Sequence, residues 1–201
     1  MKTTVIDYKA GNLTSVLKAL RHLGAEVEVT DSDLGLVERA ERIVLPGVGH
    51  FAATKRLDDT GLTGAIRAAI GRGAPFLGIC VGMQWLYSGS TEAPEQQGLR
   101  CFAETCSRFT EGAKKIPHVG WNSLEVRKGS KLLAGAEPGE FVYFTHSYKG
   151  PVTADTAAVT EYIEPFAAAV ERGNVMGVQF HPEKSGETGL KILKNFLEVR
   201  A

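Results

Sequence analysis

The fold and the chemistry of this chain are both indicated by one stretch, Phe76-Leu77-Gly78-Ile79-Cys80-Val81-Gly82. Its apolar beginning is typical of a strand that is buried on both faces of a parallel sheet. It ends in GxCxG, the cysteine counterpart of the GxSxG turn that presents a nucleophile between a strand and a helix. The aligned amide dipoles of a helix N-terminus favour the reactive thiolate. Most single cysteines are structural, but the two glycines on either side of Cys80, Gly78 and Gly82, after a buried strand predict that Cys80 is a nucleophile.

Strand and helix patterns alternate around this stretch. Apolar residues recur with a period of 3.6 over residues 13–23, which predicts a helix with Asn12 as its cap and Gly24 as its end. Such alternation predicts an α/β fold, flavodoxin-like, with a mostly parallel central sheet and helices on both faces. The pattern predicts strands over 3–7, 25–30, 42–45 and 76–79, and a further helix around 62–70.

The second half of the chain has shorter strand patterns, which predict an antiparallel extension of the same sheet. The candidates are residues 122–126, 141–148, 157–162 and 175–180, followed by a final helix over 188–199. No repeat or linker divides the sequence, and roughly 150 residues per domain is the usual size. We therefore expect a single domain that spans residues 1–201.

The composition disfavours several classes of protein. Lys and Arg total 23 and Asp and Glu total 23, so the formal net charge is zero, which argues against a polyanion-binding protein. The N-terminus has no signal-peptide pattern and no apolar run reaches about 18 residues, so a cytoplasmic protein is expected. Cys80, Cys101 and Cys106 form neither a disulfide framework nor the ligand spacing of a structural zinc site. Neither a metal nor a cofactor is expected.

A histidine and a carboxylate follow the last strand pattern, in His181-Pro182-Glu183. Pro182 favours extended geometry at His181, and in an extended chain residues two apart point the same way. His181 and Glu183 are therefore expected to face one site, where Glu183 orients the imidazole and His181 takes the proton from Cys80. An isolated histidine at a strand end is usually structural, but the cysteine elbow in the same chain favours the catalytic interpretation.

Acyl transfer also needs hydrogen-bond donors for the developing oxyanion. The Val81 amide directly follows the nucleophile, and the turn Pro46-Gly47-Val48-Gly49 offers the Val48 amide as a second donor. Residues 47–52 also fit GxGxx(G/A), the dinucleotide-binding fingerprint, so an oxidoreductase is an alternative. It is disfavoured because the position about 20 residues later lies in a helical pattern and is not acidic.

The motif segments closely resemble those of the class I, or triad, glutamine amidotransferases. This resemblance is carried by Leu77-Gly78-Ile79-Cys80-Val81-Gly82-Met83-Gln84, Pro46-Gly47-Val48-Gly49 and His181-Pro182-Glu183. Residues 7–12, 117–122 and 146–148, with Lys184-Ser185, narrow it to the glutaminase subunits of imidazole glycerol phosphate synthase, a family of histidine biosynthesis. The resemblance extends from residue 5 to residue 185.

The resemblance implies hydrolysis of glutamine to glutamate and ammonia. Cys80 would attack the side-chain amide to form a glutamyl thioester, and His181 would protonate the departing ammonia and then activate water. A carboxylate suits the ammonium group of glutamine, and Glu92 matches that position, with Glu95 as a competitor. The residues that the resemblance assigns to glutamine binding are Gly47, Gly49, Gln84, Glu92, Ser147 and Tyr148.

The resemblance also implies a partner in a heterodimer, a (β/α)8-barrel cyclase subunit that receives the ammonia through an internal tunnel. The cyclase makes imidazole glycerol phosphate and aminoimidazole carboxamide ribonucleotide. Asn12, Trp121 and Lys184 match positions near that interface, and an exposed tryptophan is a good interface anchor. Two alternatives stay open: a class I glutaminase that serves anthranilate or pyridoxal phosphate synthesis, and a cysteine hydrolase that shares the elbow and acts without a partner.

Overall fold

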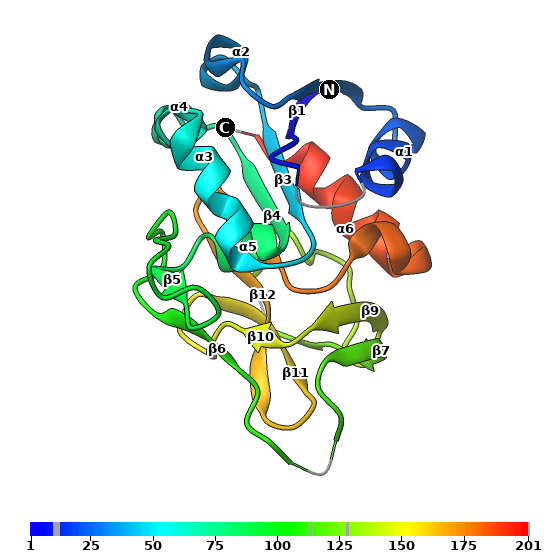
Figure 1. Cartoon of the computed structure of the whole chain (residues 1–201). Coiled ribbons are helices and arrows are strands. Elements are labelled where there is room, and N and C mark those ends of the chain that lie inside the picture. The colour runs from blue at the N-terminus through cyan, green and yellow to red at the C-terminus, as the bar shows by residue number, and fades with distance from the viewer. Residues whose placement is uncertain (10–12, 113, 128, 201) are drawn as a thin grey trace.

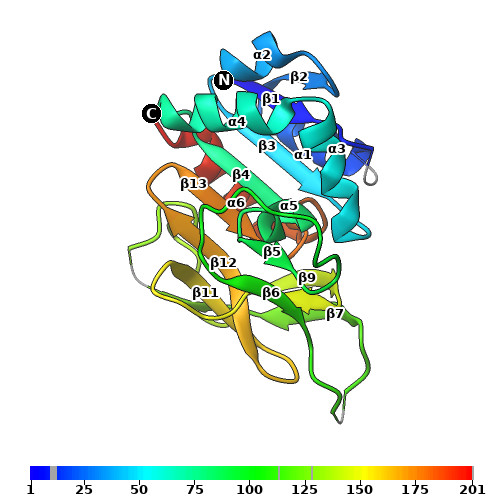
Figure 2. The ribbon, with the colours of Figure 1, turned by 60° about the vertical axis from the view of Figure 1, so that its left-hand side comes forward.

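The computed structural model describes residues 1–9, 13–112, 114–127 and 129–200. In these residues a mixed sheet of eight strands has helices on both faces, so the predicted α/β fold class is confirmed (Figures 1 and 2). In spatial order its strands are β2 (Glu26–Thr30), β1 (Lys2–Ile6), β3 (Ile43–Gly47), β4 (Phe76–Cys80), β13 (Val175–Val178), β12 (Pro165–Arg172), β11 (Thr156–Glu161) and β8 (Glu125–Val126).

Strands β2, β1, β3, β4 and β13 run parallel to one another. Strands β3, β4 and β13 are buried along their whole length, as expected for strands that are covered on both faces. The register places Gly47 of β3 beside Cys80 of β4, and Val178 of β13 beside Ile79. Because the carboxyl ends of parallel strands meet at one edge, the segments that follow β3, β4 and β13 converge there.

Helices α1 and α6 cover one face of the sheet, and α3 and α4 cover the other (Figures 1 and 2). Helix α1 ends where Gly24 adopts a φ of 81°, as predicted, whereas its predicted cap, Asn12, lies outside the described residues. The helices are α1 (Thr14–His22), α2 (Leu34–Glu38), α3 (Lys55–Asp59), α4 (Leu62–Gly71), α5 (Val81–Gln84) and α6 (Gly186–Glu198), with the 3-10 helices η1 (Phe51–Thr54) and η2 (Pro182–Lys184).

The pairing in the second half of the chain differs from the prediction. The prediction that β13 belongs to an antiparallel extension is correct for its pairing with β12. It is wrong for its other neighbour, because β13 pairs parallel with β4. The strands β7 (His118–Ser123) and β9 (Phe141–His146) form a separate antiparallel pair instead of extending the main sheet. Their side chains alternate between a buried and an exposed face, which suits a pair that covers the core on one side only.

Strand β12 has no counterpart among the predicted elements. Its centre, Ala167-Ala168-Ala169, has little intrinsic preference for strand, so the local pattern conceals it. The strand forms because it lies between β11 and β13 and pairs with both. A further small sheet contains β10 (Tyr148–Lys149), β6 (Thr105–Arg108) and β5 (Gly89–Ser90).

No helix in the described residues is long and apolar enough to cross a membrane. The same ranges contain no group of three or more His, Cys, Asp or Glu side chains that could hold a metal ion. Cys80, Cys101 and Cys106 are free thiols.

Candidate active site

Cys80 lies at the sharp turn between β4 and α5. Its backbone has a φ of 53° and a ψ of −108°, a strained conformation for a residue with a side chain. A Cβ at Gly82 would lie 1.9 Å from the Leu45 carbonyl oxygen, and a Cβ at Gly78 would lie 2.4 Å from that of Gly82. The predicted elbow with its two required glycines is therefore confirmed. Helix α5 has only four residues, so fewer aligned peptide dipoles act on the thiol than the pattern suggests.

The pair formed by His181 and Glu183 is buried beside this elbow. The Nδ1 atom of His181 lies 2.9 Å from Oε1 of Glu183, and the two side chains are 1% and 4% exposed. Burial opposes a charge on the imidazole, but the adjacent Cys80 and Glu183 outweigh it and raise the pKa of His181. Nε2 of His181 has no hydrogen-bond partner among the described residues. An imidazole held in this way can pass a proton between a nucleophile and a leaving group.

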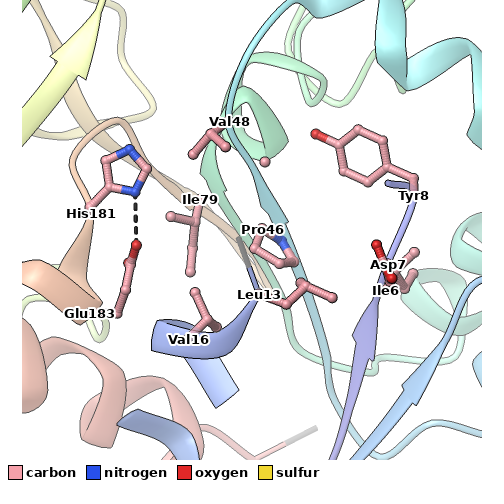
Figure 3. Close-up of a pocket in the computed structure, with 11 residues that line it drawn as sticks. Ile6, Asp7, Tyr8, Leu13, Val16, Pro46, Val48, Ile79, His181 and Glu183 are labelled. Atoms are coloured by element: carbon pink, nitrogen blue, oxygen red, sulfur yellow. Dashed lines mark hydrogen bonds and ion pairs between the residues drawn. The ribbon is translucent and has the colours of Figure 1, made fainter. Parts of the chain in front are cut away.

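A small pocket lies between the His181–Glu183 pair and the end of strand β1 (Figure 3). Besides His181 and Glu183, its lining includes Tyr8 and two further predicted site residues, Gly47 and Val48. A Cβ at Gly47 would lie 2.0 Å from the hydroxyl of the buried Tyr8, so a side chain at this position would displace the Tyr8 side chain. Burial raises the pKa of Tyr8, so its hydroxyl stays neutral.

A larger cleft of about 220 Å³ has Cys80 in its lining. The carboxylate of Glu92 accepts a hydrogen bond from the Phe51 amide at 2.7 Å, which holds it beside the turn that follows β3. Glu95 is exposed outside this cleft. The predicted site residues that line the cleft are Gly49, Cys80, Val81, Gln84, Glu92, Ser147 and Tyr148.

Gln84 has only one polar atom left for a ligand in this cleft. Its Nε2 atom donates to the Tyr148 carbonyl at 2.9 Å and to Oε1 of Gln179 at 3.0 Å. An amide NH2 group has two protons, and both are used here. The free Oε1 can therefore accept from an ammonium or amide N–H group of a ligand, but Gln84 cannot donate to a carboxylate.

Gln179 is a site residue that the sequence analysis missed. It is fully buried, and its Nε2 atom donates to the sulfur of Cys80 at 3.6 Å. Gln179 stands two positions before His181, just as Glu183 stands two positions after it. The period of an extended chain, which associated His181 with Glu183, could therefore also have identified Gln179.

A pair of buried histidines, His118 and His146, supports the wall of the cleft. His146 donates from Nδ1 to the Tyr148 carbonyl at 2.9 Å, so its Nε2 accepts from Nδ1 of His118 at 3.1 Å. The His118 ring also stacks on Tyr162, with 4.0 Å between the ring centres. Burial lowers the pKa of His118 to about 4 and that of His146 to about 3, so both rings are neutral.

The neutral histidine pair predicts a loss of stability in mild acid. An unfolded histidine titrates near pH 6.5, whereas folded His146 stays neutral to about pH 3, so the unfolded state binds more protons between these values. The free energy of unfolding therefore decreases as the pH is lowered through this window, by about 1.4 kcal/mol per pH unit for such a histidine. His181 has the opposite sign, because its raised pKa stabilises the fold below pH 6.5 and that stabilisation is lost as the pH rises.

Urea unfolding at pH 6.5 and pH 5 measures this effect. The free energy of unfolding of H146Q should fall by about 2 kcal/mol less over this interval than that of the wild type. H22Q is the matched control, because His22 is exposed on α1, and it should behave like the wild type. An equal loss in H146Q and the wild type would contradict the neutral pair.

The predicted interface residues Trp121 and Lys184 lie around one aromatic ring on the surface. Trp121 is 55% exposed, and its ring centre lies 6.1 Å from that of Tyr143. Nζ of Lys184 lies 5.9 Å from the centre of the same ring. Val119 and Phe141 are also exposed on the β7–β9 pair, so this face has the apolar character of an interaction surface. Asn12, the third predicted interface residue, lies outside the described residues.

The fold and this site define a class of enzyme in which a cysteine attacks an acyl group and a buried histidine–carboxylate pair handles the proton. The comparisons agree with this class. The profile of the family "Glutamine amidotransferase class-I" matches residues 4–199. Solved structures described as a glutamine amidotransferase and as PurLQS from Thermotoga maritima share the fold, with TM-scores of 0.76 and 0.75 at 20% and 22% identity. The matches cover 98% of this chain and 97% of each of those chains.

Closer relatives refine the assignment. The chain is 47% identical to "Imidazole glycerol phosphate synthase subunit HisH" of Caldanaerobacter subterraneus subsp. tengcongensis, over 97% of both chains. It is 46% identical to the subunit of the same name from Aquifex aeolicus, over 98% of this chain and 96% of the relative. The chain therefore belongs to the class I glutamine amidotransferases and, among them, to the HisH family.

Proposed function

We propose that this chain hydrolyses glutamine to glutamate and ammonia as the glutaminase subunit of imidazole glycerol phosphate synthase. The observation that carries the proposal is the position of Cys80, which is next to the buried His181–Glu183 pair and lines the open cleft. Membership of the HisH family supports this function over a glutaminase for anthranilate or pyridoxal phosphate synthesis. Membership of this family also supports the glutaminase function over that of a dinucleotide-dependent oxidoreductase.

In the proposed mechanism Nε2 of His181 takes the proton of the Cys80 thiol, and the sulfur attacks the side-chain amide carbon of glutamine. The amides of Val81 and Val48 are the proposed donors to the oxyanion of the tetrahedral intermediate. When this intermediate collapses, Nε2 of His181 gives its proton to the leaving ammonia, and a glutamyl thioester remains on Cys80. His181 then takes a proton from water, which attacks the thioester and releases glutamate. Glu183 keeps the second ring proton on Nδ1 throughout.

The cleft suits the zwitterionic end of free glutamine. Glu92 and the free Oε1 of Gln84 are both acceptors, so we assign them to the ammonium group of the substrate. The Ser147 hydroxyl, the Tyr148 segment and the Gly49 backbone are then left for the carboxylate. Gly47 lines the neighbouring pocket instead, where its proposed role is to shape the turn that supplies the Val48 amide.

A second subunit receives the ammonia in the proposed enzyme. The names of the relatives identify them as subunits of a synthase, which supports the presence of a second subunit. We propose that this partner is a cyclase with a (β/α)8 barrel and that the two subunits form a heterodimer. We assign the exposed face around Trp121 and Lys184, together with Asn12, to that partner. We propose that the enzyme acts in the cytoplasm and that glutamine hydrolysis requires no metal or cofactor.

A glutaminase assay with and without the partner tests this function. Glutamate is measured for the purified chain alone, then with a cyclase subunit, and then with the cyclase and its phosphoribulosyl formimino nucleotide substrate. We expect the full mixture to be at least about tenfold faster, a difference of ~1.4 kcal/mol in the barrier. A synthase subunit for anthranilate serves as the control partner and should give no stimulation. Hydrolysis without stimulation by the cyclase would refute the subunit assignment, and no hydrolysis in any mixture would refute the glutaminase activity.

A further inference from the structure

Gln179 is a buried polar residue that the mechanism above does not use. Its backbone amide donates to the Ala168 carbonyl at 2.8 Å, and its Nε2 atom donates to the sulfur of Cys80 at 3.6 Å. Both side chains are buried, so water does not compete effectively for this contact. An N–H group that points at sulfur stabilises a thiolate more than a thiol or a thioester, because only the thiolate carries a full negative charge.

A chain of buried amides determines which end of Gln179 meets the sulfur. The Tyr148 carbonyl can only accept a hydrogen bond, so Gln84 must present its NH2 group there. The second proton of that NH2 group points at Gln179, which must therefore present its oxygen. The NH2 group of Gln179 is left for Cys80. Reversal of either amide would place two like groups in contact, so the network assigns the orientation.

We propose that Gln179 is a positioning residue for the nucleophile, whose NH2 group stabilises the Cys80 thiolate and holds the sulfur in one direction. This inference rests on the proposed function and deepens it. Gln179 is not part of the cleft lining, so its effect falls on the chemical step and not on glutamine binding. Other groups near the sulfur include the His181 ring, the Thr145 carbonyl at 3.9 Å and the neutral Tyr8 hydroxyl.

Alkylation of Cys80 by iodoacetamide tests this role without glutamine or a partner. The rate is measured against pH for the wild type, for the isosteric Q179E and for the apolar Q179M, and mass spectrometry locates the label on Cys80. We expect the midpoint of the profile to rise by about one pH unit in Q179M and by more in Q179E, with alkylation at pH 7 about tenfold slower. In the glutaminase assay kcat should fall by a similar factor, with KM within about twofold of the wild type.

Q96M is the matched control, because Gln96 is another buried glutamine, which bonds to Asp58 and to the Gln97 carbonyl. Its alkylation profile should equal that of the wild type. Unchanged profiles in Q179E and Q179M, or failure of both variants to fold, would overturn the proposal and leave Gln179 as a structural residue. A chain that is alkylated as expected but hydrolyses no glutamine would instead refute only the proposed function.

Discussion

Replacement of Cys80 by alanine is expected to lower kcat for glutamine hydrolysis by at least about 10⁴-fold. The proposed thioester cannot form without the sulfur, so only a slow direct attack of water on the amide would remain. The substitution removes one buried atom and keeps the backbone strain, because alanine and cysteine meet the same restriction at a φ of 53°. Glutamate production with the cyclase present measures the loss, and thermal unfolding and partner binding should remain close to those of the wild type.

Two further measurements make this result specific to the nucleophile. C101A is the control for a general effect of thiol loss, because Cys101 is a partly exposed free thiol that does not line the cleft. It should keep wild-type activity. The C80A heterodimer should still form the cyclase products when ammonium salts are supplied, because only the source of ammonia is lost. Glutamine hydrolysis at the wild-type rate in C80A would contradict the assignment of Cys80.

Replacement of Glu183 by glutamine is the second large effect, an expected loss of about 10³- to 10⁴-fold in kcat. The carboxylate accepts the hydrogen bond from Nδ1 of His181 at 2.9 Å, and it contributes to the raised pKa of that ring. A glutamine amide can donate to Nδ1 instead, which moves the ring proton to Nε2 and leaves no acceptor for the proton of Cys80. The loss should appear in kcat, with KM little changed, because Glu183 does not line the cleft.

The matched control for this change is E187Q, since Glu187 is an exposed acid in the first turn of α6. It carries the same loss of charge four positions further along the chain and should keep wild-type kinetics. Steady-state rates over pH 5 to 9 for both variants show whether His181 no longer acts as a base or acts as a base over a different pH range. A wild-type profile and rate in E183Q would show that Glu183 does not orient the histidine.

The sequence predicts correctly those features that arise from short-range geometry. Gly78 and Gly82 indicate the elbow because a side chain at either position would meet a backbone carbonyl within 2.4 Å. The sequence predicts that His181 and Glu183 face one site, because residues two apart in an extended chain point the same way. The structure places their side chains in contact. Gly24 ends a helix because only glycine adopts its positive φ without strain.

The features that the sequence does not predict depend on partners that are distant in the chain. Strand β12 is rich in alanine and forms only because β11 and β13 pair with it on both sides. The β7–β9 pair separates from the main sheet because one of its faces covers the core while Val119, Trp121 and Phe141 stay exposed. Local periodicity contains no information about which strand lies beside another.

The candidate site likewise has features that depend on nearby residues and features that depend on residues distant in the chain. The sequence by itself determined the nucleophile candidate and its base, because elbow glycines and an extended His-Pro-Glu segment act within a few residues. Only the tertiary structure decided that Gly49 lines the cleft of Cys80 while Gly47 and Val48 line the pocket beside His181. It alone brought Gln179 to the sulfur, across 99 positions of chain, because parallel pairing of β4 with β13 places their carboxyl ends together.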